Sequence, residues 1–261
     1  MANIRNFYNF LDSIAPFNTQ EEWDNSGALV LTEREIKKVL ICLDATLDSI
    51  NEAKEKNAEL IISHHPVIFS PLSFLNPCGA AETALKNGIG IISCHTNLDI
   101  SEYCADNILS NELKEKIGFI EKEILDITKS TPTSKGFGKI GEFKTQIPFS
   151  EVKDALKRVY DCEHLICSKT TKDIKTLAFC CGGGSSYLEK IAELNIDAFI
   201  TSDCKHSSFI FANNTNTALF CPTHYEMEKP MMKKLISVLQ KAFPEIKFIL
   251  SEKESSPSCA L

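Results

Sequence analysis

The chain has 261 residues, of which 43% are hydrophobic and 24% charged, as is ordinary for a globular protein of one large domain or two modest ones. A net charge of -7 argues against binding to nucleic acid through a broad basic face. The N-terminal residues lack an apolar signal core, and no apolar run approaches the ~18 residues of a membrane span. We therefore expect a cytoplasmic protein with no membrane partner.

The cysteine content is high, at eleven residues, but its pattern does not favour disulfides. The number is odd, most of the thiols lie inside apolar runs, and the sequence contains no CxxC pair. A Cys-rich zinc site therefore has little support. We expect reduced thiols that pack mostly as small core residues.

The first half of the chain alternates segments with helical and strand character. The predicted helices are residues 4–14, 47–56 and 80–87, and the predicted strands are residues 28–31, 39–43, 60–63 and 89–93. The strands are continuous apolar runs of the kind found in buried parallel sheets. This alternation predicts an α/β fold with a largely parallel sheet.

The second half repeats the alternation. Its predicted strands are residues 137–143, 164–167, 177–181, 198–201 and 218–221, and its predicted helices are residues 150–159, 187–194 and 231–243. The repetition is explained equally well by a degenerate internal duplication and by two unrelated βαβ units. The polar residues from 251 onwards are expected to fray.

Potential metal ligands follow three of the predicted strands. His64 and His65 end the first of these strands, Asp99 follows the second, and His224 and Glu228 follow the third. In open parallel sheets, ligands gather beyond the carboxyl ends of the strands, so these residues can converge although they lie far apart in the chain. The pattern predicts a metal site at that edge.

Imidazole and carboxylate ligands together suit Zn, Mn, Fe or Co. Three histidines and two carboxylates exceed the needs of one tetrahedral ion, so two divalent ions are the economical interpretation. Such a pair would generate a nucleophile from water near neutral pH. Taken singly, the His pair fits a core or capping role, Asp99 a helix cap and Glu228 a solvated helix position. The joint pattern carries the prediction.

A glycine-rich segment and a nearby histidine are weaker candidates for substrate binding. The run 182–186, which includes Gly183 and Ser185, opens a predicted helix and could cradle a phosphate through its backbone amides. It lacks the lysine of a P-loop, and a tight turn explains it about as well. Lys205 and His206 could also contact a substrate.

Several motifs together resemble one known family. They are Glu22-Trp23-Asp24-Asn25-Ser26-Gly27, Ile62-Ser63-His64-His65-Pro66, His95-Thr96-Asn97-Leu98-Asp99, Gly138-Lys139-Ile140-Gly141-Glu142 and His224-Tyr225-Glu226-Met227-Glu228. In this order they are similar to the motifs of the GTP cyclohydrolase I type 2 homologue family, also called the NIF-three-like family. The resemblance runs from about residue 4 to residue 245. One departure lies at residues 201–207, where many relatives carry a glycine second and a histidine one place later.

The resemblance implies two similar α/β lobes with mixed, largely parallel sheets and a dimetal cleft between them, here expected at residues 1–125 and 126–250, with a flexible tail at 251–261. It implies a ring-shaped homohexamer. Carried over, the metal ligands would be His64, His65, Asp99, His224 and Glu228. The family name implies that the imidazole ring of GTP is opened to give dihydroneopterin triphosphate and formate. His95 is then our candidate for the acid that protonates the departing nitrogen.

Two rival hypotheses share the same residues. The protein could act as a phosphoesterase on the dimetal site, or it could bind or deliver metal, or act as a regulatory protein, without turnover. Assays with defined metal content would separate the three.

Overall fold

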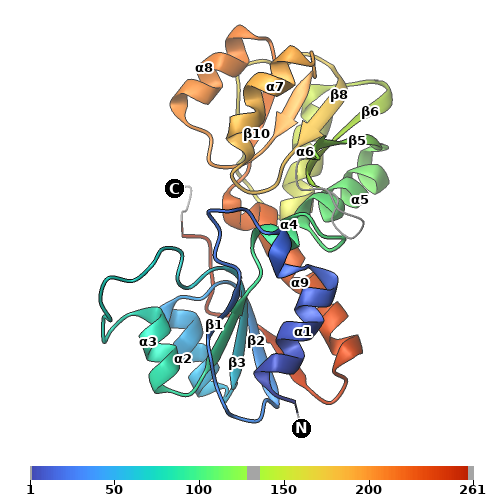
Figure 1. Cartoon of the computed structure of the whole chain (residues 1–261). Helices are drawn as coiled ribbons and strands as arrows, with labels where there is room; N and C mark the ends of the chain where they lie inside the picture. Colours follow the sequence, from blue (N-terminus) through green and yellow to red (C-terminus); the bar gives the residue numbers. More distant parts are fainter. Residues whose placement is uncertain (1, 128–135, 258–261) are drawn as a thin grey trace. The chain divides into compact units, whose positions relative to one another are not determined.

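The structure is a computed structural model that describes residues 2–127 and 136–257 (Figure 1). It confirms the predicted α/β class, with two mixed sheets. The described residues form two compact units: one comprises residues 2–103 and 231–255, and the other comprises residues 104–127, 136–230 and 256–257. The chain changes unit near residue 104 and returns near residue 231, and the lobes expected at residues 1–125 and 126–250 stay a prediction. None of the helices in the described ranges is long and apolar enough to cross a membrane.

The first unit is built on a five-stranded sheet. The strand order is β1-β4-β3-β2-β11. The strands are β1 (Gly27–Val30), β2 (Lys38–Asp44), β3 (Leu60–His65), β4 (Gly90–Ser93) and β11 (Lys247–Leu250). The helices are α1 (Ile4–Ile14), α2 (Leu47–Glu55), α3 (Ala80–Lys86), α4 (Thr96–Asp99) and the C-terminal part of α9 (His224–Ala242). A short 3₁₀ helix, Phe17–Thr19, follows α1.

Three neighbouring strands of this sheet, β2, β3 and β4, are parallel. Asp44 pairs with His65 across β2 and β3, and Ser63 pairs with Ser93 across β3 and β4. Because parallel strands end at the same edge of a sheet, the residues that follow all three strands lie together there. β1 runs antiparallel to β4, so this sheet is mixed.

Helices cover both faces of the first sheet (Figure 1). α2 and α3 lie on one face, over a buried cluster that includes Leu40, Ile61 and Ile91. α1 and α9 lie on the other, where the rings of Phe7 and Phe243 stack with centroids 4.5 Å apart. Burial of side chains on both faces explains why the sequence shows continuous apolar runs rather than alternation.

The beginning of the predicted flexible tail is instead fixed. The fully buried carboxylate of Glu52, on α2, accepts hydrogen bonds from the Ser251 hydroxyl at 2.5 Å and the Glu252 amide at 3.0 Å. It also pairs with Lys56 at 2.8 Å. Burial raises the pKa of Glu52, but these hydrogen bonds outweigh it and lower that pKa to about 2. The sequence missed this anchor because it joins residues far apart in the chain; residues 258–261 of the predicted tail lie outside the described residues.

The second unit is built on a six-stranded sheet with the order β5-β6-β8-β9-β10-β7. The strands are β5 (Ile120–Asp126), β6 (Phe137–Ile147), β7 (Ile166–Cys167), β8 (Ile174–Phe179), β9 (Ala198–Ile200) and β10 (Ala218–Cys221). The helices are α5 (Ala105–Ile117), α6 (Phe149–Tyr160), α7 (Leu188–Glu193), α8 (His206–Asn214) and the start of α9, with a 3₁₀ turn at Gly184–Tyr187.

Its central strands β8, β9 and β10 are parallel to one another. The antiparallel pairs are β5 with β6, β6 with β8, and β7 with β10. Side chains alternate along β8: Leu177 and Phe179 join the core under α5 and α6, whereas Ala178 joins the core under α7 and α8. As in the first unit, the loops after three parallel strands meet at one edge. The sequence did not predict β5, β11 or α8, and it placed the start of α9 seven residues late.

Candidate metal centre

Three histidines gather at the carboxyl edge of the first sheet. His64 and His65 end β3, and His95 follows β4. One ring nitrogen from each lies within 4.8 Å of the others, so this group could hold a metal ion. The ring centroid of His95 is 5.1 Å from that of His64 and 5.3 Å from that of His65. The structure thus brings the predicted acid, His95, into the same cluster as two predicted ligands.

Each of these three imidazoles is held through its Nδ1 atom by an oxygen acceptor. The pairs are His64 with the Cys94 carbonyl oxygen at 2.7 Å, His65 with Asp44 Oδ1 at 2.8 Å, and His95 with Asp24 Oδ1 at 2.9 Å. A carbonyl oxygen or an ionised carboxylate can only accept, so Nδ1 carries the proton and donates. Nε2 is then the ring nitrogen with a lone pair for a metal, which is how metal-binding histidines are usually oriented.

Asp24 connects the loop before β1 to the segment after β4. Its side chain is fully buried. Oδ1 also accepts from the Asn25 amide at 2.7 Å, and Oδ2 accepts from the Ser26 hydroxyl at 3.0 Å, the Thr96 amide at 3.0 Å and the Thr96 hydroxyl at 2.5 Å. Burial raises the pKa of Asp24, but the hydrogen bonds from His95 and Thr96 outweigh it and hold that pKa well below its usual range. The carboxylate is therefore ionised at neutral pH.

Asp99, the fourth predicted residue from the first unit, ends the short helix α4. Its Oδ1 atom lies 3.5 Å from Nε2 of His64. This is the distance of a close pair, and it places a carboxylate beside the ring nitrogen that does not face the Cys94 carbonyl. A buried side-chain hydrogen bond from Asn97 to the Ala15 carbonyl, at 2.6 Å, ties α4 to the end of α1. The helix that carries Asp99 is therefore fixed in position.

The second unit holds a separate histidine–carboxylate group. His224 and Glu228 lie four residues apart at the start of α9, which puts both on one face of the helix. Nε2 of His224 is 2.9 Å from Glu228 Oε2, and Nδ1 is 2.6 Å from Asp203 Oδ2. Asp203 follows β9, so the histidine is oriented by the loop of a neighbouring strand. Nδ1 of His224 thus faces an aspartate oxygen, as it does in His65 and His95.

The glycine-rich segment packs against this group. Gly182 has φ +75°, and a Cβ atom there would lie 2.3 Å from Glu228 Oε1. Its carbonyl oxygen accepts from the Ser202 hydroxyl at 2.6 Å and the Ser202 amide at 3.0 Å. The glycine is therefore explained by close approach to Glu228 and by a left-handed turn. Gly183 and Ser185 lie in the short turn that follows, where phosphate binding stays a prediction.

The remaining predicted substrate residues, Lys205 and His206, lie at the start of α8 and are exposed. Among the described residues, the three-residue groups with metal-binding geometry do not include either side chain. Their contact with a substrate stays a prediction.

Sequence reasoning missed three functional-site carboxylates, Asp24, Asp44 and Asp203. Asp44 and Asp203 each follow a predicted parallel strand, as the chosen ligands do, and Asp24 lies in one of the family motifs. That common position was the available signal. It could not show which aspartate faces which histidine, because the pairs are 21 to 71 residues apart in the chain.

Two thiols of the second unit also interact. Cys204 and Cys221 are partly buried, and both are free. A side-chain hydrogen bond from Cys204 lowers the pKa of Cys221 to about 7, although burial raises it. The same contact raises the pKa of Cys204. Cys221 therefore has thiolate character near neutral pH.

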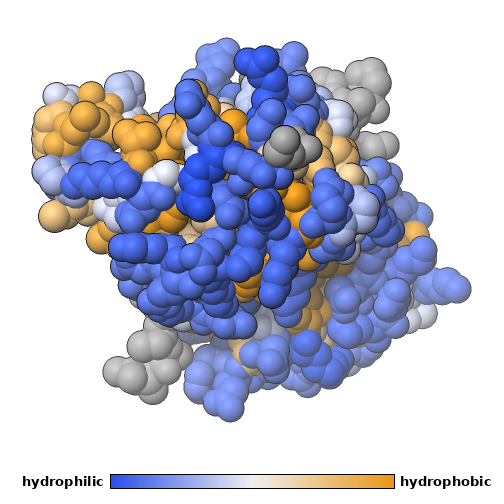
Figure 2. Space-filling model, turned by 90° about the horizontal axis from the view of Figure 1, so that it is seen from below, coloured by the Kyte–Doolittle hydropathy of each residue, from blue (hydrophilic) through white to orange (hydrophobic). Residues whose placement is uncertain are grey.

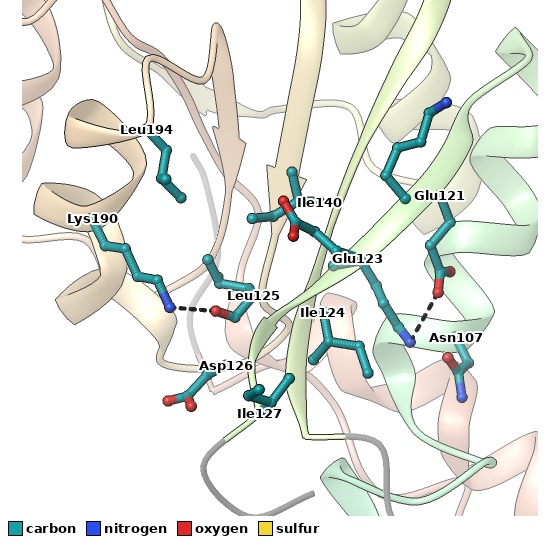
Figure 3. Close-up of a pocket in the computed structure, with 12 residues that line it drawn as sticks. Asn107, Glu121, Glu123, Ile124, Leu125, Asp126, Ile127, Ile140, Lys190 and Leu194 are labelled. Carbon is teal, nitrogen blue, oxygen red and sulfur yellow. Dashed lines mark hydrogen bonds and ion pairs between the residues drawn. The ribbon is translucent and has the colours of Figure 1, made fainter.

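A separate hollow of about 780 Å³ lies along β5, β6 and α7 in the second unit (Figure 3). Lys139 pairs there with Glu121 at 3.3 Å, and the Lys190 ammonium donates to the Leu125 carbonyl oxygen. The predicted site residues are not among the residues that line it. Both lysines are thus engaged by residues that line the same hollow.

The fold and these groups define an α/β protein with histidine and carboxylate side chains that could hold a metal ion. The chain matches the family described as Duf34/NIF3 (NGG1p interacting factor 3) over residues 2–257. It belongs to that family, as the motifs in its sequence predict.

Named relatives support this assignment. A GTP cyclohydrolase 1 type 2 homolog of Clostridium acetobutylicum is 28% identical over 264 residues, 97% of each chain. The GTP cyclohydrolase 1 type 2 of Helicobacter pylori strain 26695 is 30% identical, over 88% of each chain. A crystal structure of a Staphylococcus aureus protein, 25% identical, superimposes with a TM-score of 0.84 over 100% of this chain and 99% of that one. The Clostridium relative matches nearly the whole chain, and the Staphylococcus structure has the same fold over its full length.

Proposed function

We propose that this protein is a dinuclear metal-dependent hydrolase that opens the imidazole ring of GTP, giving dihydroneopterin triphosphate and formate. The observation that carries the proposal is the uniform orientation of four histidines. His64, His65, His95 and His224 each have Nδ1 bound to an oxygen acceptor, so Nε2 is the ring nitrogen that would bind a metal; in His224 this nitrogen already faces the Glu228 carboxylate. Packing in the core would not require four histidines to share this orientation, whereas metal binding would.

The donor set fits the metals expected from the sequence. Imidazole nitrogens with carboxylate oxygens suit Zn, Fe, Mn or Co. The proposed ligands are His64, His65, Asp99, His224 and Glu228. When bound, such ions supply Lewis-acid activation of water near neutral pH.

The remaining roles fall to residues of this chain. Asp24 keeps Nδ1 of His95 protonated and its ring fixed, so Nε2 is the atom that would take up a proton and then donate it to the leaving nitrogen. Gly183, Ser185, Lys205 and His206 are proposed to contact the nucleotide. The names of the Helicobacter and Clostridium relatives support a nucleotide substrate. We further propose a cytoplasmic homohexamer, which light scattering of the purified protein would test.

The deciding experiment uses protein loaded separately with each candidate metal, with metal content measured by mass spectrometry. GTP is then supplied, and formate and pterin fluorescence are followed. We expect two ions per chain, and product that His64→Ala abolishes. His164→Ala is the matched control, because His164 is exposed and lies outside the metal-capable groups of the described residues.

Each result has a distinct reading. Product that survives His64→Ala would contradict the proposed site. Two tightly bound ions with turnover of a phosphoester but not of GTP would favour a phosphoesterase. Tight binding with no turnover of either would favour a protein that carries or senses metal. A protein that binds none of these metals would contradict both the proposed site and the proposed reaction.

A further inference from the structure

A tryptophan stands unusually exposed beside the histidine cluster of the first unit. Trp23, the single tryptophan of the chain, is 57% exposed. Folding normally removes large aromatic side chains from water. Those that stay exposed mark binding surfaces more often than chance. The centroid of its ring lies 5.7 Å from that of His95, at an angle of 71°. The tryptophan therefore borders the proposed metal site.

Phe69 completes an aromatic pair with Trp23. The two rings stack with centroids 5.9 Å apart and planes inclined by 29°. Phe69 is 49% exposed, and its ring lies 6.0 Å from His95, at 62°. Two stacked rings thus stand edge-on to one imidazole of the cluster. They form an apolar wall, half open to solvent, next to nitrogen atoms that can bind a metal.

Hydrogen bonds fix the backbone on both sides of this pair. The Glu21 amide donates to the Thr96 hydroxyl at 2.9 Å, and Asp24 accepts from the Thr96 amide at 3.0 Å. Trp23 therefore lies between two anchors on the segment that begins with His95. On the other side, the Asn25 amide group donates to the Ile68 carbonyl oxygen at 2.6 Å, directly before Phe69. The wall is positioned before any ligand arrives, which lowers the entropic cost of binding.

We infer that Trp23 and Phe69 form the stacking wall for a planar heteroaromatic ring, and that they set this ring beside the histidine cluster. This inference deepens the proposed function and rests on it for the identity of the ring, a purine base. Stacking of a base on an aromatic side chain stabilises binding by about 1–3 kcal/mol and requires no particular hydrogen bonds. The site would therefore recognise a nucleotide by its base as well as by its phosphates.

The rest of the same loop provides a control surface. The loop between β3 and α3 also exposes Leu72, Phe74 and Leu75. Figure 2 shows hydrophobic residues gathered at the left edge of the face in view, on the side where this loop projects in Figure 1. Phe74 is 75% exposed, and it is the rings of Trp23 and Phe69 that lie against His95. Loss of Phe74 should leave the wall intact.

The test uses the fluorescence of Trp23, which reports on this site alone because the chain has one tryptophan. Metal-depleted full-length protein is titrated with guanosine 5′-monophosphate, with excitation at the red edge of tryptophan absorption. Ribose 5-phosphate, which lacks the base, is the ligand control. We expect saturable quenching by the nucleotide only. Phe69→Leu keeps an apolar side chain but removes the ring, and it should weaken binding about tenfold, equivalent to about 1.4 kcal/mol.

Phe69→Tyr should restore binding to within about twofold, and Phe74→Ala should leave it unchanged; circular dichroism checks that each variant is folded. Absence of saturable quenching, or equal quenching by ribose 5-phosphate, would overturn the inference. A change in molecular mass for Phe69→Leu without nucleotide binding would assign the pair to a contact between copies of the chain, and so would also overturn it. Nucleotide binding without GTP turnover would support the wall and contradict the proposed hydrolase. GTP turnover that Phe69→Leu leaves unchanged would support the hydrolase and contradict the wall.

Discussion

Asp24 is the residue whose replacement tests the arrangement around His95 most directly. Both of its carboxylate oxygens face donors only, so Asp24→Asn must place an NH₂ group against donors in either orientation. If the amide nitrogen replaces Oδ2, the two hydroxyls can rotate, but the buried Thr96 amide loses its acceptor. If it replaces Oδ1, the Asn25 amide loses its acceptor and the ring of His95 must change tautomer or lose its partner.

The expected cost follows from the cheaper orientation. An unpaired buried amide costs about 1–3 kcal/mol, and the remaining hydrogen bonds lose the strength that a charged acceptor gives them. We expect the free energy of unfolding to fall by about 3 kcal/mol at pH 7. The entropy of unfolding of a chain this long is roughly 0.55 kcal/mol per kelvin, so Tm should fall by about 5 °C.

The assay is thermal and urea unfolding followed by the fluorescence of Trp23, the neighbour of Asp24. Because the pKa of Asp24 is lowered by folding, its stabilisation is complete above its unfolded pKa near 4 and is lost as pH falls below that value. The difference between wild type and Asp24→Asn should therefore be constant from pH 7 to about 5 and shrink at lower pH. Asp154→Asn, at an exposed position on α6, is the control and should change stability by less than about 0.5 kcal/mol. A loss below about 0.5 kcal/mol for Asp24→Asn, or one that does not vary with pH, would refute this reasoning.

Three further outcomes are expected. Gly182→Ala should weaken metal binding at least tenfold, measured by competition with a chelator, because its Cβ would displace the Glu228 carboxylate; unchanged affinity would contradict the close approach. Glu52→Gln should lower the free energy of unfolding by about 2–3 kcal/mol at pH 7, and this difference should disappear as pH falls from about 5 to 2, since the folded pKa is about 2; a constant difference would exclude the ionised carboxylate as its source. Cys221 should react with iodoacetamide half-maximally near pH 7, followed by peptide mass spectrometry, and Cys204→Ala should move that midpoint toward 9; an unmoved midpoint would exclude the contact as its cause.

Strands that are buried on both faces were predicted well. The runs that became β2, β3 and β4 consist of apolar residues bounded by polar ones, and the helices between them carry one apolar face. β5 was missed because it is an edge strand with the charged residues Glu121, Lys122 and Glu123, a composition that protects edges and hides the strand pattern. The early start of α9 was missed because Pro230 lies inside this helix, and a proline more often marks a helix boundary.

Some features of the site were predictable and others were not. The predicted ligands of the first unit, His64, His65 and Asp99, do lie together at the carboxyl edge of its sheet, and His95 joins them. Their grouping follows from the rule for parallel strands. Which oxygen holds each Nδ1 atom depends on the register of neighbouring strands, as with Asp44 opposite His65. Register is a tertiary property that no local pattern encodes.

The sequence by itself determined the class of fold, the family and which histidines lie at strand ends, because apolar period and strand-end position are local properties of the chain. Only the tertiary structure decided how these groups are oriented. Asp24 reaches His95 across 71 positions, and Trp23 comes to stand beside the same ring. Such pairings depend on loops that meet where parallel strands end, so they exist only after the sheet has formed.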